Sequence, residues 1–150
     1  MEKESLLIAS DHGGLALKNQ LVQYLTQTRP TLQVTDLGTH DDQSVDYPKY
    51  AHLVANAVSV NPQKRGILVC GTGIGMSIAA NRYAGVRAAL VCDKFTAEMA
   101  KAHNNANVIC LGGRTLSQEQ AKAIVDAWID TQFEGGRHER RLSQIEDHLD

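Results

Sequence analysis

The chain contains few aromatic residues, few cysteines and no long apolar run. Of its 150 residues, 5% are aromatic and three are cysteine. An odd, small number of cysteines in a chain long enough to form its own core argues against a disulfide framework, so we expect reduced thiols. No apolar run reaches the ~18–20 residues of a membrane span, and residues 1–4 lack the basic-then-apolar pattern of a secretory signal. These absences predict a cytoplasmic protein.

Neither sign of charge is in large excess. The formal net charge of −2 gives no global basic field, so we expect neither nucleic acid nor a membrane as a partner. An anion would therefore have to bind at a local site. With 43% hydrophobic residues, a chain of this length fits one domain over residues 1–150 that buries about two-thirds of its unfolded surface.

Short β-rich apolar segments alternate with longer segments of helical periodicity. This alternation is typical of βαβ units that build a parallel sheet, so the chain is predicted to be an α/β protein. The predicted strands are residues 5–9, 33–36, 66–69, 86–91 and 107–111. Apolar residues one helical turn apart predict helices between them, around residues 17–25, 51–58 and 121–128.

A separate tail follows the last of these helices. The pair Gly135-Gly136 is expected to interrupt that helix. Residues 137–150 then combine several basic side chains with Leu142, Ile145 and Leu149 at helical spacing. This pattern predicts a helix with a basic start and an apolar edge that something else has to cover.

The strongest chemical signal is a glycine-rich turn after the third predicted strand. Ligands of open α/β sheets bind at the carboxyl ends of the strands, and Cys70 occupies this position directly before Gly71-Thr72-Gly73-Ile74-Gly75. Backbone N–H groups of such a turn can converge on an anion, and thiolates form readily beside them. The glycine spacing fits neither the dinucleotide fingerprint nor the phosphate loop. The alternative to an anion site is a tight strand-to-helix connection that binds no ligand.

Cys92 and Cys110 lack such a turn, so we expect both to be buried and inert.

Other polar residues have both a structural and a functional interpretation. Asp11 and His12 follow the first predicted strand, where they could cap a helix or contact a ligand. His103 lies where a helix that begins near Phe95 should end, so it could be a cap or an acid that opens a cyclic sugar, with Asn104 holding a hydroxyl.

Two arginines of the tail are candidates for holding a phosphate group. Arg137 and Arg141 are four residues apart, so on a helix they could clamp one anion, or they could form a solvated surface. No pair among the six histidines has a metal-ligand spacing, so we expect no metal.

Taken together, these segments closely resemble the type B ribose-5-phosphate isomerases, a family that also contains the galactose-6-phosphate isomerase subunits. The resemblance extends over nearly the whole chain. The segments that carry it are Ser10 to Gly14, Asp46 to Pro48, Cys70 to Asn81, His103 to Asn107, and Glu134 to His138 with Arg141. It implies a Rossmann-like three-layer α/β/α sandwich with a five-stranded parallel sheet, assembled as a homodimer or tetramer. Each active site would be shared between subunits, to which the tail of residues 137–150 would contribute.

The resemblance also implies roles for individual residues. Cys70 would remove the proton, His103 would open the sugar ring, and the glycine-rich turn would stabilise the enediolate, so no cofactor is expected. The implied substrate ligands are Asp11, His12, Tyr47, Gly71, Thr72, Gly73, Ile74, Gly75, Asn104, Arg114, Arg137 and Arg141. Some relatives use a carboxylate in the turn, and Cys70 places this chain in the cysteine-dependent branch.

The implied reaction is the interconversion of ribose 5-phosphate and ribulose 5-phosphate. Two alternatives stay open, namely isomerisation of a six-carbon phosphate such as allose or galactose 6-phosphate, and a sugar-phosphate-binding module without catalysis. The galactose-6-phosphate enzymes divide the base and the arginines between two different subunits. This chain carries both, which favours a homo-oligomer acting on a pentose phosphate.

Overall fold

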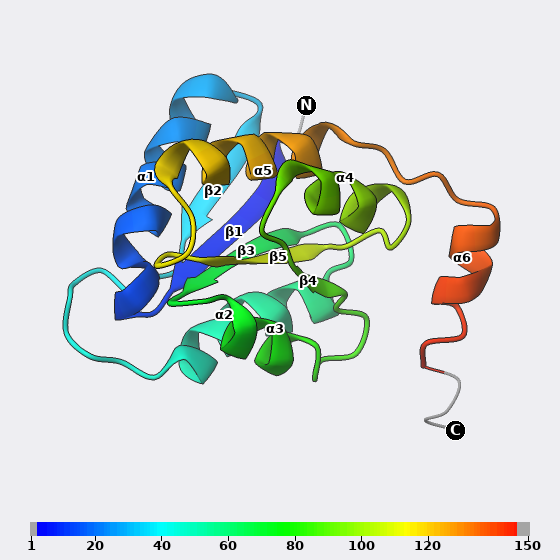
Figure 1. Ribbon diagram of the computed structural model, residues 1–150. Coiled ribbons are helices and arrows are strands. Elements are labelled where there is room, and N and C mark those ends of the chain that lie inside the picture. The colour runs from blue at the N-terminus through cyan, green and yellow to red at the C-terminus, as the bar shows by residue number, and fades with distance from the viewer. Residues whose placement is uncertain (1–2, 147–150) are drawn as a thin grey trace.

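Five parallel strands form the centre of the molecule in the computed structural model, which describes residues 3–146 (Figure 1). The strands lie in the order β2-β1-β3-β5-β4. Their bounds are Glu4–Ser10 for β1, Leu32–Asp36 for β2, Arg65–Cys70 for β3, Ala88–Leu90 for β4 and Val108–Gly112 for β5. The three central strands are almost entirely buried, as continuous apolar runs in a sheet covered on both faces should be.

Helices cover both faces of this sheet (Figure 1). One layer contains α1 (Leu15–Thr28), α4 (Lys94–Ala102) and α5 (Gln118–Asp130), and the other contains α2 (Tyr47–Val60) and α3 (Ile74–Ala80). Leu17, Leu21 and Leu25 face the first core, whereas Val54 and Val58 face the second. The predicted three-layer sandwich is therefore confirmed, including its five parallel strands.

The strand bounds differ from the predicted ones by one or two residues, and two differences have a clear structural cause. The fourth strand is shorter than residues 86–91, because the backbone N–H of Arg87 donates to the side chain of Asn107 at 2.8 Å instead of to a strand. Helix α5 ends at Asp130, before the Gly135-Gly136 pair that was expected to interrupt it. Thr131 is already extended, and its hydroxyl donates to the carbonyl of Ala127 at 2.6 Å.

The tail leaves α5 along an irregular segment and forms α6 (Arg137–Leu142) at one side of the molecule (Figure 1). The predicted helix is confirmed for these residues. Ile145 lies beyond its end and is 53% exposed, and Leu149 lies outside the described residues. Between residues 3 and 146, no helix is both long and apolar enough to cross a membrane.

A candidate active site in two halves

Strands β1 and β3 lie side by side in the sheet, and the chain leaves them in opposite directions. The first connection leads outward to β2 and the second toward β5 and β4, so their carboxyl ends form the switch point where α/β folds bind ligands. Ser10 pairs with Val69, and the backbone N–H of Asp11 donates to the Val69 carbonyl at 3.2 Å. The fold thereby places Asp11 next to Cys70.

Cys70 is the last residue of β3 and is 5% exposed. The backbone N–H of Gly73 donates to its Sγ at 3.1 Å, which stabilises negative charge on the sulfur. Gly73 can do this because it adopts a left-handed conformation, with a φ of 82°, and it caps α3. The glycine-rich turn therefore presents a backbone donor to the thiol that the sequence singled out.

The other two cysteines have different surroundings. Cys110 is buried as expected, and this burial raises the pKa of its thiol well above the ordinary value. The expectation for Cys92 was wrong, because this residue is exposed. It follows Val91 just outside the short strand β4 and precedes Asp93, which caps α4 at the surface.

Arg114 and Tyr47 lie against the glycine-rich turn. A Cβ atom added to Gly71 would lie 2.9 Å from Nη1 of Arg114, and one added to Gly75 would lie 2.7 Å from Cζ of Tyr47. The backbone N–H of Arg114 also donates to the Gly71 carbonyl at 2.9 Å. A guanidinium group and a phenol ring thus flank the turn at close range.

Asp11 and His12 complete this edge of the sheet. The Asp11 side chain accepts a hydrogen bond from Gly14 N–H at 3.1 Å, so the predicted capping role is present. Nδ1 of His12 accepts from the backbone N–H of Val45 at 3.1 Å, and the proton of the neutral ring therefore sits on Nε2. We call Asp11, His12, Tyr47, residues 70–75 and Arg114 the Cys70 half of the site.

His103 and Asn104 lie at the opposite end of the sheet. His103 caps the C-terminus of α4 and precedes β5, whose first residue, Val108, pairs with Gly66 near the start of β3. Cys70 is four residues further along β3, which corresponds to about 13 Å of strand. Helix α6, which carries Arg137 and Arg141, lies at this second end too. We call these four residues the His103 half.

Helix α6 is joined to His103 through a histidine stack. The rings of His103 and His138 are 4.2 Å apart and nearly parallel, at 11°. Oε1 of Glu134 lies 3.4 Å from Nε2 of His138 and 3.9 Å from Nε2 of His103. Desolvation is the main cause that lowers the pKa of His138, and the neighbouring His103 and Arg137 act in the same direction, while Glu134 opposes them. The spacing of histidines along the chain missed this cluster, because its members come from three separate segments.

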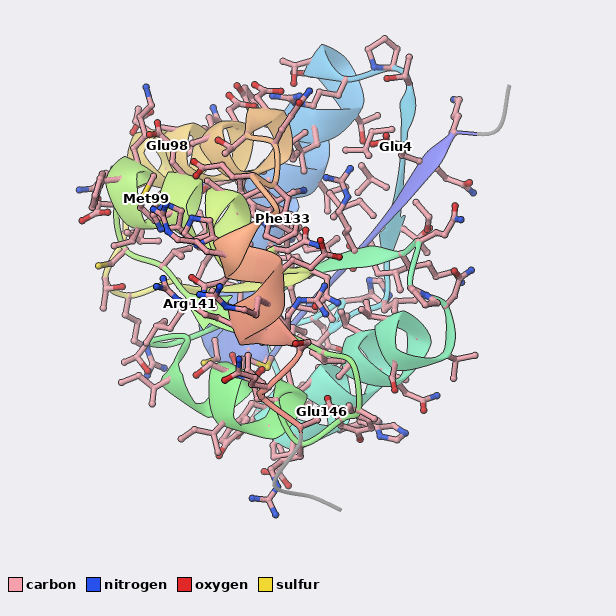
Figure 2. The ribbon with its side chains drawn as sticks, turned by 90° about the vertical axis from the view of Figure 1, so that its right-hand side faces the viewer. Glu4, Glu98, Met99, Phe133, Arg141 and Glu146 are labelled. Atoms are coloured by element: carbon pink, nitrogen blue, oxygen red, sulfur yellow. The ribbon has the colours of Figure 1, made fainter. Side chains whose placement is uncertain are left out.

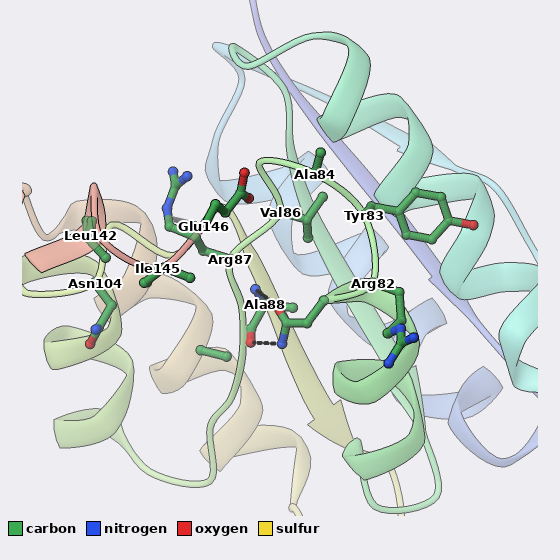
Figure 3. Close-up of a pocket in the computed structure, with 12 residues that line it drawn as sticks. Arg82, Tyr83, Ala84, Val86, Arg87, Ala88, Asn104, Leu142, Ile145 and Glu146 are labelled. Atoms are coloured by element: carbon green, nitrogen blue, oxygen red, sulfur yellow. Dashed lines mark hydrogen bonds between the residues drawn. The ribbon is translucent and has the colours of Figure 1, made fainter. Parts of the chain in front are cut away.

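Asn104 faces a cavity beside the tail. The cavity has a volume of about 740 Å³ and lies between residues 81–89 and the end of the tail. Figure 3 labels Leu142, Ile145 and Glu146 of the tail and Arg87 and Ala88 among the residues that line it. The side chains of Asn104, Arg137 and Arg141 are all exposed, and Arg141 is marked in Figure 2 on the surface of α6. Polar groups that suit an anion are thus presented outward here.

A partly buried ion pair between α1 and the end of β2 could not be predicted from the sequence. Lys18 is fully buried, and its Nζ lies 2.7 Å from both carboxylate oxygens of Asp36. Asp36 also accepts from the backbone N–H of Gly38 at 2.9 Å. This pair holds the start of the segment that runs from β2 to Tyr47. In the sequence Lys18 looks like an ordinary polar position of an amphipathic helix.

Comparison with known proteins identifies the family of this chain. The family model described as Ribose/Galactose Isomerase matches residues 6–145. The chain belongs to this family. Ribose-5-phosphate isomerase B of Escherichia coli is 42% identical over 142 residues, which cover 95% of this chain and 94% of that protein.

Solved structures of family members show the same fold. Ribose 5-phosphate isomerase from Thermotoga maritima is 48% identical, covers 95% of this chain and 97% of its own, and gives a TM-score of 0.90. Ribose-5-phosphate isomerase B from Mycoplasma genitalium, solved with bound ribulose-5-phosphate, is 43% identical and gives a TM-score of 0.92, with 97% and 95% of the two chains covered. The protein is therefore an isomerase with the family's α/β fold.

Proposed function

We propose that this family member interconverts ribose 5-phosphate and ribulose 5-phosphate, with Cys70 as the base. The observation that carries the proposal is the hydrogen bond from Gly73 N–H to Cys70 Sγ at the switch point of the sheet. The bound ribulose-5-phosphate in the Mycoplasma genitalium structure and the name of the Escherichia coli relative support a pentose phosphate as the substrate.

The chemistry needs a base, an anion hole and an acid. His103 donates a proton to the ring oxygen, the bond from C1 to this oxygen breaks, and the proton of the C1 hydroxyl is released and replaces the one that His103 gave, so the open aldehyde forms. The Cys70 thiolate then removes the C2 proton, the carbonyl oxygen becomes an enediolate oxygen, and N–H groups of residues 71–75 stabilise its charge by about 3–4 kcal/mol for each well-placed donor. Return of the proton to C1, with transfer of the hydroxyl proton from O2 to O1, gives the ketose. No net oxidation occurs, so the proposal includes no cofactor.

We further propose that each active site is built from two copies of the chain. Within one copy, the Cys70 half and the His103 half lie at opposite ends of the sheet, whereas the chemistry needs both at one sugar. Exposed apolar side chains support pairing of two copies: Ile74 and Ile78 are one turn apart on α3 and are 51% and 64% exposed, and Phe95 on α4 is 66% exposed. The partner would be a second copy, in a homodimer or a tetramer.

The family description names galactose as well as ribose, so a six-carbon sugar phosphate is the second candidate substrate.

We also propose that the protein works in the cytoplasm, because its three cysteines are unpaired, as is usual in a reducing compartment.

The test compares Cys70→Ala with Cys92→Ala in assays with ribose 5-phosphate, allose 6-phosphate and galactose 6-phosphate. Loss of the base should lower kcat by about 10²–10⁴-fold, while the matched Cys92 variant should keep normal turnover. Full activity of Cys70→Ala would remove the thiol from the reaction. A higher kcat/KM for a hexose phosphate would change the substrate. Binding of ribulose 5-phosphate without exchange of its C1 hydrogen in heavy water would indicate a binding module.

A further inference from the structure

We propose that His103, Glu134 and His138 form a site for a divalent transition-metal ion, and that an ion bound there blocks the ring-opening step. The metal-binding part of this proposal stands on the structure alone. The inhibitory part rests on the proposed function, in which His103 is the acid. In the part of the chain that the structure describes, these three residues bring their ligand atoms within 4.8 Å of one another.

The first argument is an unsatisfied ring nitrogen. His138 is 7% exposed, and its Nε2 is buried without a hydrogen-bond partner among the described residues. Leaving such a group unpaired costs about 1–3 kcal/mol. Oε1 of Glu134 lies 3.4 Å away without forming a hydrogen bond of good geometry. A metal ion between these two atoms would give the nitrogen a partner.

The second argument is the spacing of the donors. Zinc bonds of about 2.0–2.2 Å in a tetrahedral arrangement place neighbouring ligand atoms roughly 3.3 Å apart. The Glu134 to His138 separation of 3.4 Å already fits this value, and the 3.9 Å from Glu134 to His103 is about half an ångström too long. Glu134 can close the difference, because it lies in the irregular segment after α5, is exposed, and precedes two glycines.

The third argument concerns which ion the site would select. Two imidazoles and one carboxylate are the ligand set of many zinc sites that keep a position open, and this set favours Zn²⁺ over Mg²⁺. Glu134 is the single negative ligand of the cluster, and the positively charged Arg137 and Arg141 lie on the same short helix as His138. Binding should therefore depend on imidazole ligation. An oxygen-seeking ion that gains little from imidazole should not bind.

Binding would also change the histidine pair. The rings are now stacked at 11°, and both lone pairs must turn toward one point before they can share a metal ion. With its Nε2 occupied, His103 could no longer give a proton to the ring oxygen of ribose 5-phosphate. Ribulose 5-phosphate cannot form a five-membered ring, because its C5 oxygen carries the phosphate group. Exchange of its C1 hydrogen depends on the base rather than on ring opening.

The test is titration calorimetry with Zn²⁺ and Mg²⁺ on the Cys70→Ala/Cys92→Ala protein, which lacks the two thiols nearest to solvent that could also bind zinc. We expect one Zn²⁺ for each chain and no heat of binding with Mg²⁺. Glu134→Gln and His138→Asn, each added to this background, should weaken zinc binding at least about tenfold. A circular dichroism spectrum and a melting temperature that match the parent would show that each variant is folded.

Unchanged zinc affinity in both folded variants, or no zinc binding in the parent, would overturn the site. In the protein with all its cysteines, Zn²⁺ should slow conversion of ribose 5-phosphate more than it slows C1 hydrogen exchange of ribulose 5-phosphate, and Glu134→Gln should reduce this difference. Equal slowing of both reactions would overturn the inhibitory role. Because calorimetry does not depend on turnover, zinc binding would stand even if the isomerase proposal failed.

Discussion

The three cysteines show how strongly one residue's surroundings change its chemistry. Cys110 is buried in the core beneath α2 and α3, and desolvation raises the pKa of its thiol, so the unreactive thiol form persists at neutral pH. Cys92 is exposed at the surface. Iodoacetamide at about pH 8 should therefore label Cys92 in the folded protein, and Cys110 only after unfolding in urea.

Mass spectrometry of tryptic peptides would separate the labels on the individual cysteines. Cys92→Ser serves as the control and should lose the label at position 92 in the folded state while Cys110 stays unmodified. Labelling of Cys110 in the folded protein at the rate seen for Cys92 would show that its surroundings are open to solvent. This comparison does not depend on catalytic activity.

Sequence reasoning succeeded for a residue when its neighbours along the chain create its surroundings. Gly73 is three residues from Cys70, so the sequence already contained the donor that lies 3.1 Å from the sulfur. It failed for Cys92, whose exposure depends on where the edge strand β4 ends. It also missed the buried pair of Lys18 and Asp36, because two residues so far apart along the chain meet only after α1 has packed on the sheet.

At the scale of elements, α5 begins with a capping box. Oγ of Ser117 accepts from the backbone N–H of Gln120 at 3.1 Å, and the Gln120 side chain accepts from Ser117 N–H at 2.8 Å. Ser117→Ala removes the first of these bonds and should lower the free energy of unfolding by about 1 kcal/mol. In thermal unfolding this corresponds to a melting temperature about 2–4 °C lower. Ser117→Asp keeps an acceptor and should melt near the parent, and equal losses in both variants would contradict the capping role.

Arg29 at the end of α1 links this helix to α5. Its guanidinium donates to Asp130 at 2.7 and 2.9 Å and to Asp126 at 2.8 Å. The bond from Arg29 is the main cause that lowers the pKa of Asp130 below its ordinary 3.8. A carboxylate whose pKa is lower in the folded state stabilises the fold above the unfolded pKa, and this contribution disappears as the pH falls through the folded value.

Asp130→Asn should therefore lower the free energy of unfolding at pH 7 by only about 0.5 kcal/mol or less, because the Asp130 side chain is 65% exposed. The difference from the parent should shrink as the pH falls below about 3.8. Urea unfolding at a series of pH values would measure both effects, with Asp42→Asn in the exposed loop as the matched control. A difference that stayed constant down to pH 2 would exclude the ion pair as its cause.

The order of elements was predictable because apolar periodicity depends on burial, and both faces of this sheet are buried. The boundaries were harder. The predicted fourth strand included Val86 and Val91, which are apolar and buried but lie outside the paired residues Ala88–Leu90. The backbone N–H of Val86 donates to the Tyr83 carbonyl at 3.1 Å, and that of Val91 donates to the Cys110 carbonyl of β5 at 3.2 Å. Apolar character alone cannot distinguish a residue just outside a strand from one within it.

At the scale of the whole molecule, the sequence contained the residues of the candidate site but not their division. The predicted strands already placed Cys70 after the third strand and His103 before the fifth, and in the structure Cys70 ends β3 while His103 precedes β5. Parallel pairing of Cys70 with Gly112, and of Gly66 with Val108, puts them at opposite ends. Only the three-dimensional topology shows that one copy of the chain holds two half-sites.

This division makes a prediction that separates a shared site from a site within one chain. In a symmetric dimer with shared sites, Cys70→Ala inactivates one half-site and Arg141→Ala the other, so each homodimer should be nearly inactive. A dimer with one subunit of each kind pairs the intact Cys70 half of one chain with the intact His103 half of the other. Random mixing makes half of the dimers mixed, and each contains one working site of two, so about a quarter of parental activity should return.

The experiment unfolds the two variants together in urea, refolds them by dilution, and measures conversion of ribose 5-phosphate. Each variant refolded alone is the control, and sedimentation velocity should show dimers or tetramers in every sample. A site contained within one chain would give no recovery, because every chain in the mixture carries one damaged half. Recovery is therefore the result that requires Cys70 of one copy to work with Arg141 of another.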